Sequence, residues 1–307
     1  MNSPTQSSLP LISVIITTYN RRDYIIEAVE SALNQTYPHL EVLIVDDGST
    51  DNTRQLIRER YGDNPRVAYY YQENNKRAAA FNHGLRYAKG EFIATVDSDN
   101  RWLPHRLETG YDALVHNPDY DIVYGDNILI NEQGQEISRQ NMRRYSGKIT
   151  AHLMRDNCVS INTALVPRRC YEQLGPMDSN CKRADDYELW LRLSTAYRFL
   201  YIPQFMAEYR VMDDQLSSDK RGRFAATEQI LRNFQARFPE ALSPAEFRQG
   251  WAFFYTRKAR YYASVGGNAE AMKDIYRAMT YGPLCKATWR SLAAIVSGRE
   301  KRRSAAL

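Results

Sequence analysis

Cysteine is scarce in this chain of 307 residues, and the few cysteines share no regular spacing. None belongs to a C-x-x-C pair, and no set has the spacing of metal ligands. This pattern fits thiols that are buried as small apolar groups in a reducing compartment. The four positions are Cys158, Cys170, Cys181 and Cys285.

Long apolar runs and a targeting segment are also missing. In "MNSPTQSSLPLISVIITTYN" the apolar run ends within about ten residues, whereas a membrane helix needs roughly 20. The segment has no positively charged start and no small-residue cleavage site, so it is better interpreted as a first strand. We therefore expect a cytoplasmic protein, either free or peripheral on the cytoplasmic face of a membrane.

Two common phosphate-binding motifs are absent. No G-x-G-x-x-G follows any apolar run, and there is no G-x-x-x-x-G-K-[ST]. These absences disfavour dinucleotide redox chemistry and P-loop ATP hydrolysis. Any phosphate bound here must be met by a metal ion and basic side chains.

Charge is distributed unevenly, although the net charge is only +5. Residues 220–307 hold 17 lysines and arginines against 6 acids, and residues 1–219 hold 24 against 30. We predict two domains, 1–219 and a basic helical region, 220–307, that includes a tetratricopeptide-like hairpin at 259–283. The basic region is either a solvated face or a site for an anionic membrane surface. No recognition motif favours nucleic acid.

The first hundred residues alternate between strand and helix patterns. Short runs rich in β-branched and aromatic residues predict strands at 11–18, 40–47, 66–72 and 91–97. Apolar residues at helical spacing lie between these runs, and Ser49 or Thr50 is the expected N-cap of the second helix. Such βαβ units form a parallel sheet, and ligands bind at the carboxyl ends of its strands.

Further along the chain, mixed elements precede the helical region. Alternation around Gly134 predicts a hairpin, and residues 184–197 have the spacing of a helix. Two short strands are expected at 199–202 and 205–211. Strand signals vanish from about residue 222.

Acidic residues end two of the predicted strands. Asp46 and Asp47 follow one, and Asp97 and Asp99, in "EFIATVDSDNRWLPHRLE", follow another. Side chains at i and i+2 of an extended stretch point the same way, so Asp97 and Asp99 can share a divalent cation such as Mn2+ or Mg2+. The alternative is that each pair belongs to an ordinary solvated turn.

Three ordered motifs carry a family resemblance. They are "VIITTYNRRDYIIEAVESALNQTYPHLEVLIVDDGSTDNT", "GEFIATVDSDNRWLPHRLE" and "ADDYELWLRL". Together they resemble the signatures of family-2 glycosyltransferases over roughly residues 11–215. The resemblance implies the GT-A fold, a mainly parallel sheet flanked by helices, here with a C-terminal helical appendage.

The resemblance also implies a donor site. Thr17 and Tyr19 would line the nucleotide pocket, and Asp47 would read the base, which is uracil in many members. Arg77, in "NNKRAAAFN", falls on a loop where relatives often place a residue over the donor, although many members have glycine nearby. Asp97 would lie beside the ribose of the donor or in the water shell of the metal ion.

The reacting groups follow from the same likeness. Asp99 would bind the metal ion, Mn2+ or Mg2+, and Asp186 would act as the base. Asp185 takes the position where relatives usually have glutamate, and Trp190 and Arg192 would pack and pair within their helix. The implied reaction moves a sugar from a nucleotide-sugar donor, a UDP-sugar, to a glycan or lipid-linked acceptor with inversion, in cell-surface polysaccharide assembly.

Two departures from relatives bear on this assignment. Many relatives have a histidine after "YR", whereas this chain reads "EYRVMDDQLSS". If that histidine helps to hold the donor phosphate or the metal ion, either Arg210, Asp213 or Asp214 must compensate or the activity is altered. Processive members carry Q-x-x-R-W, and "QILRN" at 229–233 lacks its tryptophan, which favours the addition of one sugar.

Two other readings stay open. The chain could be a catalytically silent module of the same fold that binds nucleotide or glycan. It could also be a nucleotidyltransferase, although "TTYNRRDY" offers no glycine for the loop that such an enzyme needs.

Overall fold

A computed structural model describes residues 9–140, 142–181, 183–212 and 219–298. Its contacts divide the chain into two compact units. Unit 1 is Met1–Lys148 with Cys158–Ala226, and unit 2 is Ile149–Asn157 with Thr227–Leu307. The sequence placed this boundary between residues 219 and 220, and the contacts place it after Ala226.

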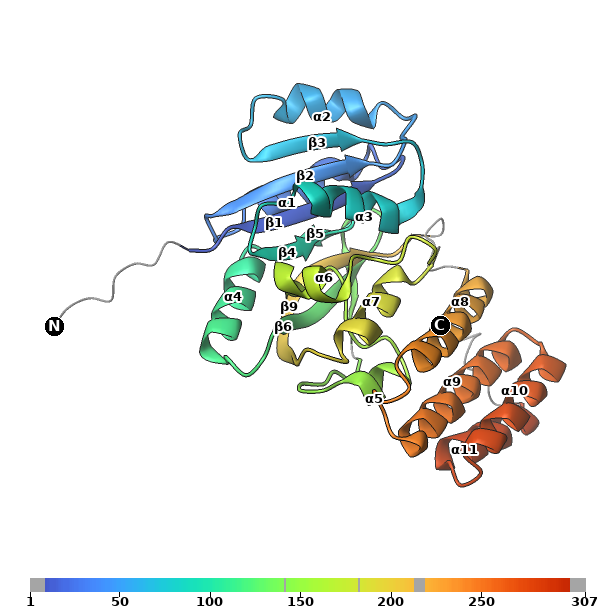
Figure 1. The fold of residues 1–307 in the computed structure, drawn as a ribbon. Coiled ribbons are helices and arrows are strands. Elements are labelled where there is room, and N and C mark those ends of the chain that lie inside the picture. The colour runs from blue at the N-terminus through green and yellow to red at the C-terminus, as the bar shows by residue number, and fades with distance from the viewer. Residues whose placement is uncertain (1–8, 141, 182, 213–218, 299–307) are drawn as a thin grey trace. The chain divides into compact units, whose positions relative to one another are not determined.

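The four predicted N-terminal strands are present and parallel (Figure 1). The strand order in the sheet is β3-β2-β1-β4-β8-β6-β9-β5, and β7 pairs with β6. Strands β8, β7 and β5 run antiparallel to their partners, so the sheet is mixed beyond β4. The bounds are β1 Ile12–Thr18, β2 Leu40–Asp46, β3 Val67–Tyr71, β4 Phe92–Thr95, β5 Arg101–Trp102, β6 Ile122–Ile130, β7 Glu136–Arg139, β8 Leu165–Pro167 and β9 Phe199–Arg210.

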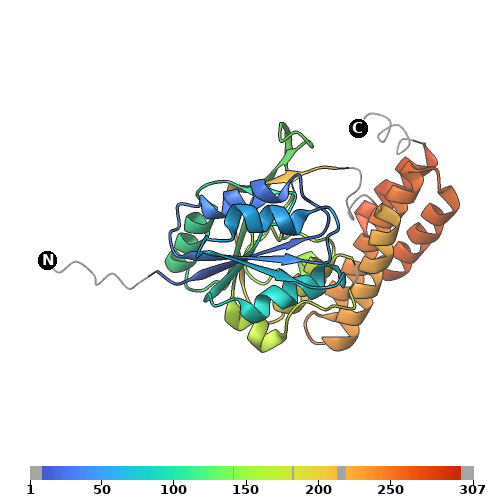
Figure 2. The ribbon, with the colours of Figure 1, turned by 90° about the horizontal axis from the view of Figure 1, so that it is seen from above.

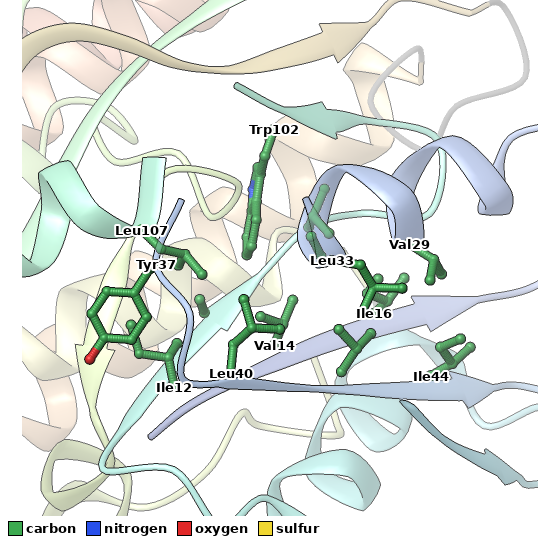
Figure 3. Packing of buried hydrophobic residues seen from close by; sticks show 14 of the residues in the cluster. Ile12, Val14, Ile16, Val29, Leu33, Tyr37, Leu40, Ile44, Trp102 and Leu107 are labelled. Carbon is green, nitrogen blue, oxygen red and sulfur yellow. The ribbon is translucent and has the colours of Figure 1, made fainter. Parts of the chain in front are cut away.

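Helices cover both faces of this sheet (Figure 2). Alternate β1 side chains, among them Val14 and Ile16, pack in one apolar cluster with α1 and α2 (Figure 3). On the other face, Gly84 of α3 lets the helix approach the sheet, since a Cβ there would lie 2.9 Å from Ile15 Cγ2. The helices of unit 1 that precede α8 are α1 Ile25–Leu33, α2 Thr53–Tyr61, α3 Lys76–Tyr87, α4 Arg106–His116, α6 Arg168–Leu174 and α7 Asp185–Leu193.

Burial on both faces explains why β1 and β2 were recognisable from sequence. Every residue of β1 is buried, and six of the seven residues of β2 are buried. A strand covered on both sides needs a continuous apolar run rather than an alternating one. The first two predicted strands have this pattern, and the structure confirms them.

The region after α4 confirms one prediction and corrects another. β6 and β7 form the predicted hairpin, with Gly134 at a φ of +79° in the turn. Phe199–Arg210, however, form one strand, β9, where two were expected. Its register against β6 shifts between the Tyr124 and Asp126 pairings, where Pro203 lies, and proline is tolerated in a strand at such a bulge.

The expected cap of α2 was wrong. The helix begins at Thr53, and its N-cap is Asn52, which has a left-handed φ of 64°. Asp51 takes over the capping contact, because its Oδ1 accepts a hydrogen bond from Thr53 N at 3.2 Å. Ser49 and Thr50 instead bond to the loop after β1.

Unit 2 consists of helices. The predicted hairpin is confirmed in α9 and α10, with Gly266 at a φ of +84° in the turn. A capping box between Ser243 and Glu246 starts α9. No helix in the described parts of the chain combines the length and the apolar character needed to cross a bilayer. The bounds are α5 Thr150–Leu153, α8 Lys220–Arg237 (which begins in unit 1), α9 Pro244–Ser264, α10 Asn268–Tyr281 and α11 Lys286–Val296.

Candidate active site

The loops after β1 and β2 are joined by hydrogen bonds at the carboxyl edge of the sheet. Asn20 N donates to Ser49 Oγ at 2.9 Å, and Asn20 Oδ1 accepts from Thr50 N at 2.8 Å. Thr17, at the end of β1, is buried, and Tyr19, in the loop, is half exposed. The structure thus places both predicted nucleotide-pocket residues at an edge where two loops brace each other.

Neutral donors hold the acidic pair at the end of β2. Asp46 is fully buried, and its Oδ2 accepts from the Tyr69 hydroxyl at 2.7 Å while its Oδ1 accepts from a backbone N–H of its own loop at 2.8 Å. Asp47 Oδ1 accepts from Gln72 Nε2 at 2.7 Å and from Asn75 N at 2.8 Å. Both oxygens of Asp46 therefore serve the fold, and Asp47 remains the candidate for reading the base.

The acidic pair after β4 lies among amides and cations. Asn162 Nδ2 donates to Asp97 Oδ2 at 2.9 Å, and Asn162 Oδ1 accepts from Asp97 N at 2.8 Å. Asn100 Nδ2 also donates to Asp97 Oδ2, at 3.3 Å. The Asp99 carboxylate lies 3.7 Å from Arg21 Nε. Residues of β4, of the loop after β1 and of a segment some sixty residues further on thus meet at one place.

Arg77 joins the end of β4 to the start of α7. Its Nη1 donates to Asp97 Oδ1 at 3.2 Å, and its Nε and Nη2 both contact the Asp185 carboxylate. Asp186 Oδ1 lies 3.6 Å from Nη2. Burial lowers the pKa of Arg77, but the carboxylates, Asp185 first, raise it well above its usual value, so the guanidinium stays charged. The structure therefore brings the predicted residues Arg77, Asp97 and Asp186 together.

The two adjacent aspartates of α7 have different surroundings. The Asp185 side chain is 6% exposed and bonds directly to Arg77, whereas that of Asp186 is 19% exposed and lies 3.6 Å from the same guanidinium. Burial, with Asp185 adding to it, raises the pKa of Asp186 above its ordinary value, although Arg77 and Arg223 oppose the shift. Asp186 is thus the more accessible of the two carboxylates, and its pKa is raised by burial.

Backbone strain occurs beside these candidates. Among the described non-glycine residues with left-handed φ, Lys76 (71°) precedes Arg77 and Ala184 (54°) precedes Asp185. Asn20, in the loop after β1, has a φ of 51°. Lysine and alanine rarely adopt this region, and such strain costs about 1–3 kcal/mol and concentrates at functional sites.

Arg210 has a structural task that its motif did not suggest. It is 1% exposed, and its guanidinium donates to the carbonyls of Asp99 (2.9 Å) and Glu132 (2.6 Å) and to Glu27 Oε2 (2.7 Å). Its backbone N–H also donates to Asn100 Oδ1 at 2.7 Å. Arg210 therefore anchors the loop that carries Asp99, which corrects the expectation that it replaces the missing histidine. The other two candidates for that task, Asp213 and Asp214, lie outside the described residues.

The remaining motif residues of α7 behave as the resemblance implies. Trp190 is buried against Phe199. Arg192 pairs with Glu188 at 2.8 Å and donates to the carbonyls that end α6, including Gly175 O at 2.7 Å. These contacts fix α7, and with it Asp185 and Asp186, against the rest of unit 1.

A divalent cation fits part of this site. Across the described ranges, no group of three or more His, Cys, Asp or Glu side chains is arranged to hold a metal ion. Asp97, Asp185 and Asp186 instead surround a guanidinium. The hard oxygens of Asp99 and Asp97 still suit Mg2+ or Mn2+, which commonly keeps waters and takes other ligands from substrate phosphates.

Sequence reasoning missed the residues that position the candidates. Asn162 and Asn100 fix the Asp97 carboxylate, and Glu27 receives Arg210. Asn162 lies outside the three motifs, and the contacts of Asn162 and Glu27 join segments that are distant in the sequence. The one available signal was the asparagine directly after the D-x-D pair.

The fold and this edge of the sheet define a GT-A glycosyltransferase, and comparison with known proteins agrees. The family model described as Glycosyl transferase family 2 matches residues 13–170. The chain belongs to glycosyltransferase family 2. It is an enzyme of this class, and its sheet flanked by helices is the GT-A fold.

Among relatives, the putative teichuronic acid biosynthesis glycosyltransferase TuaG of Bacillus subtilis is 30% identical over 217 residues, which cover 69% of this chain and 83% of TuaG. The chondroitin synthase of Escherichia coli is 33% identical over 222 residues, or 72% of this chain. The aligned region spans only 32% of that synthase.

Solved structures share the fold at low identity. TarS 1–349 of S. aureus has a TM-score of 0.66 at 18% identity, covering 94% of this chain and 89% of that chain. Its complex with UDP-GlcNAc has a TM-score of 0.59 at 18% identity, covering 86% and 88%. The mannosyltransferase PcManGT from Pyrobaculum calidifontis, in complex with GDP-Man and Mn2+, has a TM-score of 0.65 at 20% identity, covering 94% and 79%.

Proposed function

We propose that this enzyme transfers one sugar from a UDP-sugar, with inversion, to a hydroxyl of a glycan or lipid-linked acceptor. The observation that carries the proposal is the cluster in which Arg77 holds Asp97, Asp185 and Asp186 at the carboxyl edge of the sheet, beside Asp99. It gathers a candidate base and candidate donor-binding groups where α/β sheets bind ligands.

Asp186 acts as the general base in this mechanism. It takes the proton of the acceptor hydroxyl, and the oxygen forms a bond to the anomeric carbon. The bond from that carbon to the diphosphate oxygen breaks, and the nucleoside diphosphate leaves with the electron pair. This single displacement inverts the anomeric centre. The raised pKa of Asp186 supports the role, because a base works best with a pKa nearer the operating pH.

The donor is bound by the loops around Asp186. Tyr19 offers a half-exposed ring to the base, and Asp47 accepts a hydrogen bond from it. Asp97 faces the ribose, and Arg77 orients the carboxylates around the sugar and its phosphates. A Mn2+ or Mg2+ ion on Asp99 would offset charge on the departing diphosphate.

The acceptor class and the nucleotide are inferred from relatives. Chondroitin synthase and TuaG are named for polymers that contain sugars, and TarS was solved with UDP-GlcNAc. PcManGT was solved with GDP-Man, so guanine donors belong in any test. The lack of Q-x-x-R-W supports the addition of one sugar in cell-surface polysaccharide assembly.

Screening nucleotide sugars for hydrolysis, with and without Mn2+ or Mg2+, tests the proposal. We expect one UDP-sugar to be hydrolysed by the wild-type chain and hardly by Asp186→Asn. Nuclear magnetic resonance of the transfer product then reports the anomeric configuration, and product length reports how many sugars are added.

A catalytically silent module of the same fold predicts another result. Such a protein would bind UDP or a nucleotide sugar but would hydrolyse none of the panel and transfer none to any glycan. That combination would overturn the enzymatic proposal. A product with retained configuration would overturn the role of Asp186.

A further inference from the structure

Helix α11 of unit 2 has no fully buried apolar residue. Its two buried residues are small and polar, Thr288 and Ser291, and Thr288 Oγ1 lies 2.8 Å from Thr256 Oγ1 of α9. Surface helices of globular proteins normally turn apolar residues inward. Leu292 and Ile295 lie on the same side of the helix as Thr288 and are partly buried, so the inward face of α11 is mixed in polarity.

Three other apolar side chains of this region are exposed. Trp289 is 53% exposed and Val296 is 74% exposed. Leu284, in the turn before α11, is 91% exposed. Trp289 and Val296 are seven residues apart, so they lie on one side of the helix, two turns from each other.

Basic side chains share this face. Lys286 and Arg290 are exposed on α11, three residues before and one residue after Trp289. Across the described residues 284–298 these two are the basic side chains, and there is no acidic one.

We infer that the outward face of α11 is a docking surface for an anionic lipid bilayer. Trp, Leu and Val beside Lys and Arg are the composition of helices that lie in the interface plane of a membrane. The apolar side chains would enter the boundary between headgroups and acyl chains, and the basic ones would meet lipid phosphates.

Charge distinguishes this occupant from a second copy of the chain. Two copies that met through this face would bring Lys286 and Arg290 of each copy near those of the other, and like charges oppose such an interface. Nucleic acid would satisfy the charges but would leave Val296 and Leu284 in water.

Sedimentation with vesicles tests the inference. It requires neither donor nor acceptor, so its result is independent of the proposed sugar transfer. We expect the full chain to bind phosphatidylcholine vesicles that contain phosphatidylglycerol and to bind pure phosphatidylcholine much less. High salt should weaken the binding, because it screens the attraction.

Matched variants locate the surface. The double variant Lys286→Glu with Arg290→Glu should lower the partition coefficient at least about tenfold, since each basic residue near an anionic surface contributes appreciably. The double variant Arg58→Glu with Arg66→Glu makes the same charge change at exposed positions of unit 1 and should have a much smaller effect.

The apolar contribution has its own pair of variants. Val296→Ser should weaken vesicle binding, whereas Val115→Ser, at a position 55% exposed on α4, should not. Trp289→Ala should weaken binding further, and blue-shifted Trp289 fluorescence on anionic vesicles would report insertion even if that variant folded poorly.

Several results would overturn the inference. They are absence of binding to anionic vesicles, equal binding to neutral vesicles, and equal losses in the α11 variants and their unit 1 controls. Concentration-dependent dimerisation that Trp289→Ala abolishes, without vesicle binding, would identify a second copy as the occupant. Binding to RNA but not to vesicles would identify a nucleic-acid surface.

Discussion

Each unit contains a cluster of partly buried acids and bases, and the two clusters differ in their proportions of acid to base. In unit 1, one guanidinium, that of Arg77, faces three carboxylates, those of Asp97, Asp185 and Asp186. The more distant Arg223 adds some positive potential at Asp186. The carboxylates outnumber the cation in contact with them, and the pKa of Asp186 is raised, mainly by burial.

In the cluster of unit 2 there are at least as many basic side chains as carboxylates. Glu228 accepts hydrogen bonds from Lys258, Arg232 and Tyr255 at 2.8–2.9 Å. Although burial opposes it, these donors lower the pKa of Glu228 to about 2. Asp274 lies between the two cases, because burial raises its pKa while Lys258 and Arg277 oppose the shift.

The difference shows that burial alone does not decide the state of a carboxylate. Glu228 is partly buried but is bonded directly to two cations, so it stays ionised to low pH. Asp186 shares its nearest guanidinium with Asp185, which takes the direct contacts. A cluster with too few cations attracts a proton or another cation, and perturbed groups of this kind are typical of functional sites.

The largest expected effect is a loss of turnover in Asp186→Asn, in the acid-rich cluster of unit 1. This change keeps the shape of the side chain but removes its basicity, so turnover should fall by about 10²–10⁴ while donor affinity changes little. Rates of transfer to an acceptor and calorimetric binding of the donor give the two quantities.

Asp185→Asn is the matched control for this prediction. Asp185 is committed to Arg77, so its loss should weaken donor positioning and reduce turnover less. If Asp186→Asn kept near-normal transfer and Asp185→Asn were inactive, the base would be Asp185 and the two roles would be exchanged.

A second prediction concerns the metal ion that we propose for Asp99, beside the acid-rich cluster of unit 1. Asp99→Ala should reduce the affinity for UDP in the presence of Mn2+ by about 100-fold, because an ion that bridges the diphosphate loses its protein ligand. Calorimetry of UDP binding with and without Mn2+ measures the metal-dependent part. Ser98→Ala, in the same loop, should keep that part, and an Asp99→Ala variant with wild-type metal dependence would refute the metal assignment.

A third prediction removes the guanidinium of Arg77, the cation in contact with the three carboxylates of unit 1. In Arg77→Gln the cation that most lowers the pKa of Asp186 is lost, so that pKa should rise further. A base is active when it is deprotonated, so the acid limb of the pH profile of kcat/KM should move to higher pH. An unchanged acid limb in a folded variant would mean that Asp186 does not control it.

Much of the fold could be predicted from the sequence because its signals are local. Strands buried on both faces, such as β1 and β2, require continuous apolar runs, and the glycine at position 134 marks a turn. The acidic pairs at the ends of β2 and β4 were also visible, because parallel strands bring their carboxyl ends to one edge.

Contacts between distant segments could not be predicted in this way. Ser49 was expected to cap α2, but its hydroxyl accepts from Asn20, 29 residues away. The guanidinium of Arg210 bonds to the carbonyl of Asp99, 111 residues away, and no local pattern distinguishes such an arginine from one that binds phosphate. The α7 motif indicated an acidic helix start. Only the structure shows that Asp185 forms the direct ion pair with Arg77 and that Asp186 is more accessible.

The smallest expected effect tests the balanced cluster of unit 2. The pKa of Glu228 is about 2 in the folded chain and 4.5 in its ordinary state. A lowered pKa gives stability that is present above the ordinary value and is lost as pH falls from about 4.5 to about 2. Glu228→Gln should therefore lower the local free energy of unfolding at neutral pH by about 1–2 kcal/mol, after allowance for partial solvent screening, and by much less near the lower pKa.

Hydrogen exchange of the α9 amides, which include those around Lys258, reports this local stability in the full chain. Glu240→Gln is the control, because Glu240 is exposed and the chemical change is the same. If the two variants matched at neutral pH, or if the loss in Glu228→Gln did not diminish on acidification, the ion cluster of unit 2 would not stabilise the folded state. Equal protection of the α9 amides in the two variants would show that the cations bonded to Glu228 do not make its ionised form stabilising. The two clusters would then differ in their contacts but not in this effect on stability.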